Sequence, residues 1–293
     1  MNVCGKDITI HGRVIRIARL AAETYEFLSH PHDAIHALRH SGTRIDLFTF
    51  TQQLPDVTPR YDFLMEWDNL AAVPVSTFDH WWKHQINGKT RNMVRRAETK
   101  GITVREVPFD DGLVHDIKAI YDETPVRQGR SFWHYRKDFE SVRRENATFL
   151  DRSAFLGAFN EGTLIGFAKL VSDGDGRQAA LMQILSMVSH RDKAPANALI
   201  AHAVRTCAER GTGHLVYSHF AYGRKDRDGL SDFKQHNGFQ RIDLPRYYVP
   251  LTALGRLALR LRLHHGIADH VPEPMLAQLR RVRSRWAAST TSL

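Results

Sequence analysis

The stretch Lys89-Thr-Arg-Asn-Met-Val-Arg-Arg-Ala-Glu-Thr-Lys-Gly101, which runs directly into Ile102-Thr-Val-Arg-Glu-Val107, says most about how this chain folds. Its first part has the composition of a basic helix. Gly101 is the residue type that commonly ends a helix in a left-handed turn. The alternating residues that follow are typical of a strand. The sequence therefore predicts a helix, a glycine stop and a strand in direct succession.

The predicted helix has two distinct faces. At roughly 100° per residue, Arg96 and Lys100 fall within about 20° of Lys89, so the three cations share one polar line. Aligned cations suit an anionic group such as a phosphate, but a basic helix face is also commonly just solvated. Spacing alone leaves both interpretations open. An apolar stripe on the adjacent arc could pack against a core, and it consists of Ile86, Met93 and Ala97.

The composition is that of an ordinary globular protein with room for one large domain or two smaller ones. The chain has 293 residues, 42% of them hydrophobic, and a formal net charge of +9 that favours anionic partners. Seven arginines and only two acidic residues follow Pro250. The start has no signal-peptide pattern, and no segment reaches the roughly 20 apolar residues of a membrane span. We expect a cytoplasmic protein whose C-terminal arginines favour an anionic membrane surface.

Residues 102–251 alternate between strand and helix patterns in an informative order. A strand is followed by two helices, a hairpin around Asn160-Glu-Gly162, a strand, a helix, a strand at 214–220, a short helix and a last strand. A hairpin followed by two strand–helix units implies a mixed, mostly antiparallel sheet with helices on both faces, an α+β class. The order matches the acyltransferase fold of the Gcn5-related N-acetyltransferases (GNAT). Earlier in the chain, a strand pair around Gly12 is predicted at 8–17, and further strands at 44–50 and 61–67.

Two separated segments resemble one branch of that superfamily. Residues 89–107 resemble the Lys-x-Arg-x-x-x-Arg-(Arg/Lys)-Ala-Glu-x-x-Gly-(Val/Ile)-x-Val stretch of the Fem-type (FemAB-like) peptidoglycan aminoacyltransferases. Asp232-Phe-Lys-Gln-His-Asn-Gly-Phe239 resembles their Phe-Lys-x-x-Phe-Gly signature, with Asn237 in place of the second phenylalanine. The resemblance implies a reduced GNAT-like lobe at 1–101, an acyltransferase domain at 102–251 and a basic helical extension at 252–293.

The resemblance also implies transfer of an acyl or aminoacyl group to a primary amine. The acceptor would be an anionic molecule, such as a nucleotide-linked or lipid-linked sugar or peptide. Lys234 would sit beside the reacting carbonyl, where a fixed cation stabilises the negative charge that develops on oxygen. The side chains that the resemblance places at the acceptor are Lys89, Arg91, Arg96, Lys100 and Phe233.

The expected acyl donor is acetyl-CoA or another acyl-CoA, although the sequence departs from the pattern here. Members that use coenzyme A carry a glycine-rich turn whose N–H groups hold the pyrophosphate at a helix N-terminus. The corresponding residues 189–197 contain no glycine, so Arg191 and Lys193 would hold phosphates by charge. Fem-type enzymes use aminoacyl-tRNA and have a weakened turn, which keeps that donor open. The other predicted donor-binding residues are Met187, Val188, Ala196 and Asn197.

Candidates for acid–base chemistry lie on the predicted strand at 214–220. Alternation places Tyr217 and His219 on one face, and a histidine is the better general base because its pKa lies nearer neutrality. An ordinary, partly buried histidine is the simpler interpretation of His219. His264 and His265, with His270, have no carboxylate or cysteine partner at a recognised spacing, so we expect surface residues and no metal.

Two further interpretations remain open. The chain could be an aminoacyl-tRNA-dependent transferase, or a non-catalytic module that kept the fold and binds lipid or nucleic acid through its basic surfaces. Residues 251–263 are helical in composition and could pack between two surfaces or lie on anionic lipid. The arginine-rich residues 275–286 favour lipid head groups or an RNA backbone.

Overall fold

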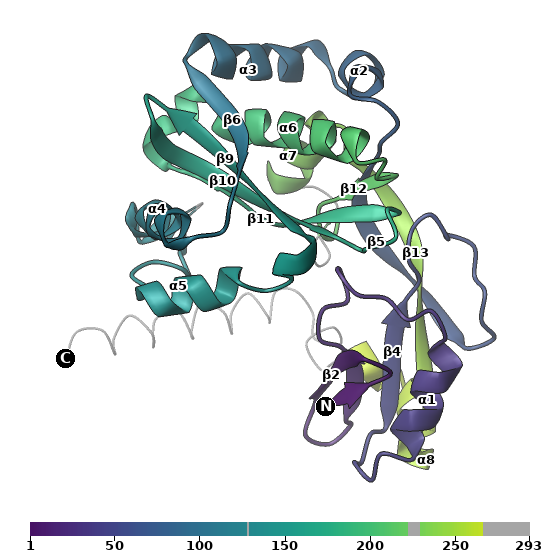
Figure 1. Ribbon diagram of the computed structural model, residues 1–293. Helices are drawn as coiled ribbons and strands as arrows, with labels where there is room; N and C mark the ends of the chain where they lie inside the picture. The colour runs from purple at the N-terminus through teal and green to yellow at the C-terminus, as the bar shows by residue number, and fades with distance from the viewer. Residues whose placement is uncertain (128, 222–228, 266–293) are drawn as a thin grey trace.

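A computed structural model of the protein describes residues 1–127, 129–221 and 229–265 (Figure 1). Within these residues the chain forms one large sheet with helices packed on it. The strands are β1 (Asn2–Val3), β2 (Lys6–His11), β3 (Ile17–Leu20), β4 (Leu47–Thr51), β5 (Leu64–Pro74), β6 (Ile102–Val107), β7 (Val126–Arg127), β8 (Arg130–Ser131), β9 (Ser153–Asn160), β10 (Thr163–Ser172), β11 (Gln178–Ser186), β12 (His214–Val216) and β13 (Gln240–Pro250).

The helices are mostly short, and two of the longest, α3 and α6, pack against each other. They are α1 (Pro31–Arg39), α2 (Phe78–His80) with the π-helical turn η1 (Trp81–Gln85), α3 (Gly88–Thr99), α4 (Asp111–Asp122), α5 (Phe139–Asn146), α6 (Pro195–Glu209), α7 (Gly229–His236) and α8 (Ala253–Arg260), with 3-10 turns η2 (Leu150–Arg152), η3 (Val188–Lys193) and η4 (Leu263–His265).

In the described residues, eleven strands form one sheet in the order β1-β2-β3-β4-β13-β5-β12-β11-β10-β9-β6, and β7 and β8 form a separate two-stranded sheet. Only the pairs β3–β4 and β11–β12 are parallel, and the other neighbours are antiparallel. The long strands β5 and β13 pair along most of their length and connect the two ends of the sheet. The predicted mixed, mostly antiparallel sheet flanked by helices is therefore confirmed.

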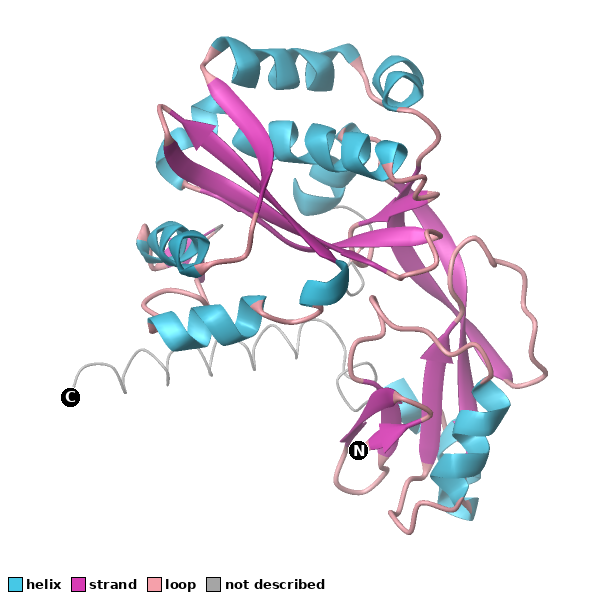
Figure 2. Ribbon diagram, viewed as in Figure 1, coloured by secondary structure: helices cyan, strands magenta, loops and turns pink. Residues whose placement is uncertain are grey.

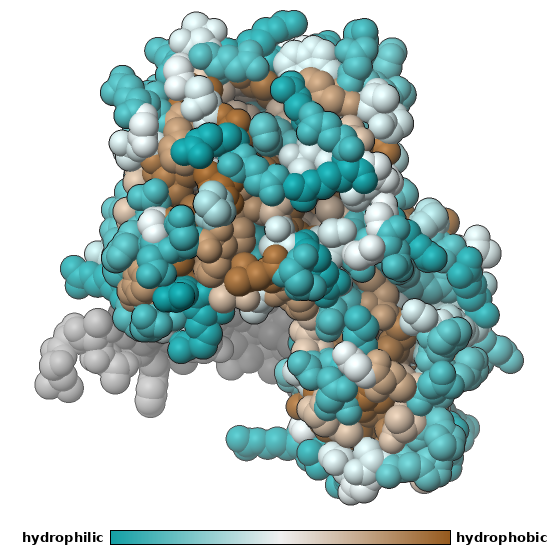
Figure 3. Space-filling model, viewed as in Figure 1, coloured by the Kyte–Doolittle hydropathy of each residue, from teal (hydrophilic) through white to brown (hydrophobic). Residues whose placement is uncertain are grey.

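The sheet carries two lobes of unequal size (Figures 1 and 2). The smaller lobe contains β1 to β4 with α1 and α8, and the larger contains β6 and β9 to β12. Helices α3, α6 and α7 lie on one side of the larger lobe's sheet, and α4 and α5 lie on the other. On the face in Figure 3, hydrophilic side chains cover the outer helices, while apolar surface gathers over the strands. Each lobe has its own hydrophobic core.

Helix α3 follows the sequence prediction closely. The side chain of Asn87 accepts a hydrogen bond from the N–H of Thr90 and so caps its start. Gly101 adopts φ +78° just after its end, as expected for a left-handed stop. Val94 and Ala97 are buried in the larger lobe's core, while the cations of the polar line are exposed. Helix α3 packs on α6 of the larger lobe. The lobe boundary predicted at residue 101 stays a prediction.

Candidate functional site

The two parallel strands in the middle of the larger lobe separate partway along their length. β12 pairs with β11 only at Gln178–Ala180, and β11 then continues from 181 to 186 without pairing to β12. After Val216 the chain leaves the sheet direction, and Ser218 adopts φ +52°. Among the described residues, no strand pairs with this edge of β11 beyond Ala180, although the Ser186 carbonyl accepts a hydrogen bond from Arg127. A ligand that lies along residues 181–185 can therefore hydrogen-bond to this edge.

A cavity of about 670 Å³ opens at this point of divergence. Its walls come from the end of β11, the start of α6, the segment after β12 and the start of α7. It is lined largely by apolar and aromatic side chains with a few polar groups, a composition typical of small-molecule sites. The residues most relevant to chemistry are Arg127, Phe132, Ser186, Met187, Val188, Arg191, Ala196, Asn197, Tyr217 and Phe233.

The turn before α6 keeps a glycine-like backbone without containing a glycine. Ala194 adopts φ +54° and ψ +43°, a conformation that costs an L-residue about 1 kcal/mol or more. Pro195 then occupies the first turn of α6, where its missing N–H is tolerated. In the glycine-free segment 189–197, one alanine therefore takes the left-handed conformation that glycine adopts without strain.

Two N–H groups of this turn are already occupied by a carboxylate. Glu123 accepts hydrogen bonds from the N–H groups of Val188 (2.6 Å) and Ser189 (2.9 Å), and from the Ser189 hydroxyl (2.7 Å). Burial would raise the pKa of Glu123, but these hydrogen bonds and the nearby Arg127 outweigh it and lower the pKa. Glu123 thus places a protein anion beside the mouth of the cavity, at the start of the turn.

Most of the residues predicted to bind the donor line the cavity. Met187, Val188, Arg191, Ala196 and Asn197 all do so. Lys193 is the exception, because its ammonium donates to the side-chain oxygen of Asn160 and it is not among the lining residues. Arg191 is therefore the predicted phosphate-binding cation that the structure places at the cavity.

Tyr217 and His219 do not share a face, so that prediction is wrong. Tyr217 lines the large cavity, whereas His219 lines a separate small pocket at the junction of the lobes. Alternation requires a continuous strand, but β12 ends at Val216 and Ser218 has a positive φ. The two side chains consequently face different pockets. Of the two, Tyr217 is the one that can contact a ligand in the large cavity.

Lys234 is fully buried behind the cavity wall. Its ammonium donates to the carbonyl of His219 and lies 4.7 Å from the centre of the Tyr217 ring. Tyr217 and Phe233 line the cavity, but Lys234 itself is not among the lining residues. Lys234 is therefore placed to support Tyr217 and the segment after β12, and its predicted place beside a reacting carbonyl stays a prediction.

Asn237, where the family signature has phenylalanine, links the helices around the cavity. Its side-chain oxygen accepts from the amide of Asn197 (3.0 Å), and its own amide donates to the carbonyl of Phe233 (2.8 Å). Its backbone carbonyl accepts from the indole of Trp81 (3.1 Å). The next residue, Gly238, has φ +89°, and a Cβ there would lie 2.9 Å from that indole nitrogen. The departure from the family pattern therefore has a definite structural role.

The predicted acceptor-binding cations of α3 do not line the cavity. Lys89, Arg96 and Lys100 are exposed on the outer face of the helix, whereas Met93 of the same helix does line the cavity. Arg91 donates to the carbonyls of Trp82 (3.0 Å) and Ile86 (2.7 Å) and so holds the preceding turn. A joint groove formed by these cations and Lys234 is not present among the described residues, because α3 turns its apolar side toward the cavity.

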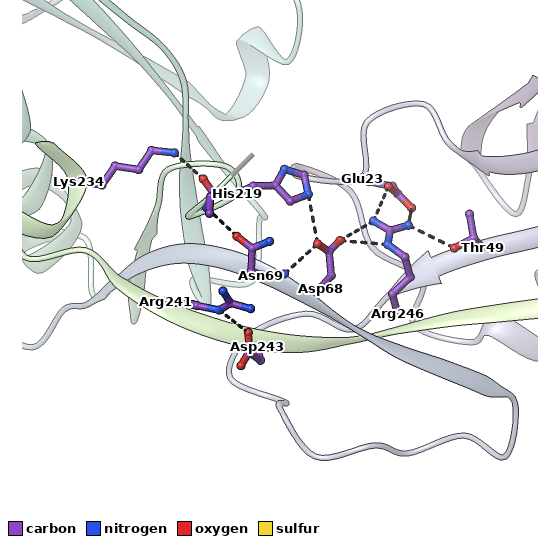
Figure 4. A network of polar contacts seen from close by, with 10 residues as sticks. Glu23, Thr49, Asp68, Asn69, His219, Lys234, Arg241, Asp243 and Arg246 are labelled. Carbon is purple, nitrogen blue, oxygen red and sulfur yellow. Dashed lines mark hydrogen bonds and ion pairs between the residues drawn. The ribbon is translucent and has the colours of Figure 1, made fainter. Parts of the chain in front are cut away.

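A polar network that the sequence did not reveal lies at the junction of the lobes (Figure 4). Arg246 of β13 makes two parallel hydrogen bonds with Glu23 (2.9 and 3.0 Å) and a third with Asp68 of β5 (3.0 Å). The ring of His219 lies 3.4 Å from Asp68. Burial alone would raise the pKa of Asp68, but the hydrogen bond from His219 and the charge of Arg246 lower it to about 2.

The histidine pair near the C-terminal end of the described chain also differs from expectation. His264 is buried rather than on the surface, and His265 is exposed. Glu66 of β5 lies within hydrogen-bonding distance of both rings. This carboxylate is far away in the sequence, so no spacing pattern could have revealed it. His270 and the arginine-rich 275–286 lie outside the described residues, as do four of the seven C-terminal arginines.

Among the residues that the structure describes, no helix is long and apolar enough to cross a membrane. This agrees with the sequence, which has no apolar stretch of that length. Contact with a membrane surface through the C-terminal arginines stays a prediction.

Comparison with known proteins finds a family similarity for part of the chain. Residues 115–226 match the Acetyltransferase (GNAT) family model. No curated protein sequence matches the chain. The fold is similar to that of FemX, with 10% identity over 82% of this chain and 83% of that chain, and a TM-score of 0.55.

Two further solved structures share the fold. One is the C-terminal DUF2156 domain of a protein assigned as a lysylphosphatidylglycerol synthetase from Agrobacterium fabrum (16% identity, 86% and 83% coverage, TM-score 0.54). The other is L-PGS from Bacillus licheniformis (14% identity, 86% and 83% coverage, TM-score 0.55). At these identities the likeness concerns the fold alone. Residues 115–226 are thus similar to the Acetyltransferase (GNAT) family, and the chain shares its fold with these solved structures.

Proposed function

We propose that this chain is an N-acyltransferase that moves an acyl group from acyl-CoA to a primary amine on an anionic acceptor. The observation that carries the proposal is the cavity where β11 and β12 separate, with Tyr217 on its wall and beside it a strand edge that no described strand pairs. Transfer needs two substrates that meet in a place shielded from water, and this cavity is both large and mostly apolar.

The strand edge and Arg191 support an extended donor with an anionic end. The acyl arm of coenzyme A contains amide groups, which can hydrogen-bond along residues 181–185 of β11 as an added strand would. Arg191 lies at the same cavity and can pair with a phosphate. Arg127 also lines the cavity, but it donates to the carbonyls of Ser186 (2.7 Å) and Ile120 (2.8 Å). It therefore stabilises the cavity wall.

The chemical step needs little from the protein beyond position and one proton. The amine nitrogen bonds to the thioester carbonyl carbon, the carbon–sulfur bond then breaks, and the electron pair leaves with sulfur. The excess proton of the attacking amine passes to water, since His219 faces another pocket. We assign Tyr217 as the group whose hydroxyl gives a proton to the departing thiolate, after which solvent restores that proton.

An anionic acceptor is supported by the position of α3. Met93 lines the cavity, and the cations Lys89, Arg96 and Lys100 form the outer face of the same helix. An acceptor whose amine enters the cavity can therefore extend its phosphate or carboxylate groups along this helix. The two lysines and the arginine attract the anionic groups of the acceptor, and the cavity positions its amine.

A second candidate donor, aminoacyl-tRNA, is favoured by one specific observation. The Glu123 carboxylate occupies the N–H groups of Val188 and Ser189, at the start of the turn whose amides hold a pyrophosphate in coenzyme A-dependent members. Repulsion between Glu123 and a pyrophosphate would weaken coenzyme A binding. An ester-linked aminoacyl donor would place no pyrophosphate there.

The test is calorimetric titration of the folded protein with acetyl-CoA. We expect saturable binding that becomes about tenfold weaker in Arg191→Ala, which corresponds to roughly 1.4 kcal/mol. Arg210→Ala is the matched control, because Arg210 is an exposed arginine paired with Glu106 and does not line this cavity. Absence of heat with acetyl-CoA would reject the acyl-CoA proposal. The tRNA candidate predicts amino-acid transfer from charged tRNA that ribonuclease abolishes.

A further inference from the structure

Three potential metal ligands converge where the C-terminal extension returns to the sheet. Glu66 Oε1 lies 3.1 Å from Nε2 of His264 and 3.0 Å from Nε2 of His265. Candidate ligand atoms of the three residues all lie within 4.8 Å of one another. Among the described residues, His264 of this group is buried, Glu66 is intermediate and His265 is exposed.

These separations fit the edge lengths of a metal coordination shell. With metal–ligand bonds of about 2.0–2.2 Å, neighbouring ligand atoms of a tetrahedral or octahedral site lie roughly 3.0–3.5 Å apart. The two Nε2–Oε1 distances fall in this range. One cation can therefore touch all three residues after small rotations of side chains that are already in place.

Local structure aims the two rings at the same point. The 3-10 turn Leu263–His265 follows α8, and the two ring centres lie 4.1 Å apart with 39° between their planes. Tyr248 of β13 packs edge-on against His264 at 4.6 Å and limits its movement. Glu66 comes from β5, the strand paired with β13. A rigid sheet thus holds the carboxylate, and a short turn presents both imidazoles.

The charge balance at Glu66 favours a cation. Arg246 is paired with Glu66 in the strand register, but its guanidinium is engaged with Glu23 and Asp68 instead. Within the described part of the chain, the only basic groups within ion-pair distance of Glu66 are the two imidazoles. A carboxylate and two imidazoles are therefore left to serve together as ligands, and imidazole binds metals in its neutral form.

We propose that Glu66, His264 and His265 form a binding site for a divalent transition-metal cation, with Zn²⁺ as the best match. Two imidazoles and one carboxylate are a ligand set that Zn²⁺ favours, and three protein ligands leave a fourth position for water or another ligand. The site is separate from the large cavity, whose lining includes none of these residues.

Metal binding here would fasten the C-terminal extension to the sheet. His264 and Glu66 are 198 residues apart in the sequence, so one cation would connect two distant parts of the chain. A cation that binds only the folded state stabilises it by mass action. The metal would therefore have a structural role, because it would cross-link β5 to the residues after α8.

The experiment is a titration of the metal-stripped, tag-free full chain with ZnCl₂, followed by calorimetry and by melting temperature. We expect one strong site and a melting temperature that rises until one equivalent has been added. Glu66→Gln and His265→Ala should each weaken binding at least tenfold and remove the rise. We expect both variants to fold, because the glutamine still accepts hydrogen bonds and His265 is exposed. Co²⁺ in place of Zn²⁺ should show the visible absorption of a tetrahedral site.

A matched control excludes binding by histidine pairs in general. His36 and His40 lie one helical turn apart, with ring centres 4.3 Å apart, and neither belongs to the Glu66 group. His36→Ala should leave the strong site and the rise in melting temperature unchanged. Equal binding by the wild type, Glu66→Gln and His265→Ala would overturn the proposal, and so would loss of the strong site in His36→Ala.

Discussion

The pockets on either side of the segment from Tyr217 to His219 are built in opposite ways. The one beside Tyr217 has a volume of about 670 Å³ and a mostly apolar wall. The one beside His219 has only about 60 Å³, and its charged side chains are paired with one another. Open apolar space with few polar groups suits substrates, whereas a small space filled by ion pairs suits a joint between lobes. We therefore place chemistry in the first and mechanical connection in the second.

The largest effect on stability should come from disrupting the ion pairs at the junction of the lobes. Arg246→Met removes the cation between Glu23 and Asp68 and leaves two partly buried carboxylates facing each other. We expect a loss of about 3 kcal/mol in the free energy of unfolding, at the low end for a broken buried pair because both carboxylates keep some solvent contact. Urea denaturation measures this loss.

The same strand provides the control for Arg246. Arg241 pairs with Asp243, and both side chains are about half exposed (Figure 4). Arg241→Ala should change the free energy of unfolding by about 0–1 kcal/mol, since exposed ion pairs contribute little. If Arg246→Met were no more destabilising than Arg241→Ala, the junction network would not hold the lobes together.

The next effect concerns activity and separates the two pockets directly. Tyr217→Phe should lower the turnover of acyl transfer about 100-fold, because it removes the hydroxyl that we assign as proton donor. The ring contacts with Phe239 (5.6 Å) and Lys234 (4.7 Å) remain, so the melting temperature should hold. Release of free thiol from acetyl-CoA in the presence of an amine measures the turnover.

His219→Ala is the counterpart on the other side of the segment. Because His219 faces the small pocket, its loss should change turnover less than Tyr217→Phe does. A larger loss of turnover in His219→Ala than in Tyr217→Phe would reverse the comparison and assign the chemistry to the junction.

A smaller effect is expected at the amide that links the helices around the large cavity. Asn237→Ala leaves the carbonyl of Phe233 and the amide of Asn197 without this partner. We expect a loss of about 1–3 kcal/mol in the free energy of unfolding, the usual cost of an unsatisfied buried group. The Michaelis constant for the donor should also rise, since Asn197 lines the cavity. Asn197→Ala should reproduce the rise in the Michaelis constant; an unchanged constant would limit Asn237 to a structural role.

The sequence predicted the elements of the larger lobe well because their signals are local. Helix α3 has an amphipathic repeat and a glycine stop, and the hairpin turns at Asn160-Glu-Gly162 with φ +51° at Glu161 and +82° at Gly162. The strand predicted at 214–220 is shorter because Ser218 takes a positive φ, which its residue type does not signal. That single dihedral angle explains the wrong prediction for His219.

The junction network and the histidine site could not be predicted from spacing. The junction network joins four separate segments, which contribute Glu23, Asp68, His219 and Arg246. The pairing of β5 with β13 is what brings Asp68 and Arg246 close to each other. A single charged residue in a sequence does not indicate which distant residues it will contact. The departure at Asn237 was visible, but its hydrogen bonds depend on where α6 begins relative to α7.

The smallest effect should appear at the edge of the large cavity, where Glu123 holds the turn before α6. Its pKa is lowered in the folded state, so its contribution to stability is present above the unfolded pKa and is lost as pH falls through the folded value. Glu123→Gln should therefore flatten the loss of stability below about pH 4.5, which thermal melts across pH measure. The variant should also bind acetyl-CoA more tightly if Glu123 repels the pyrophosphate. Weaker binding would instead mean that Glu123 orders the turn for the donor.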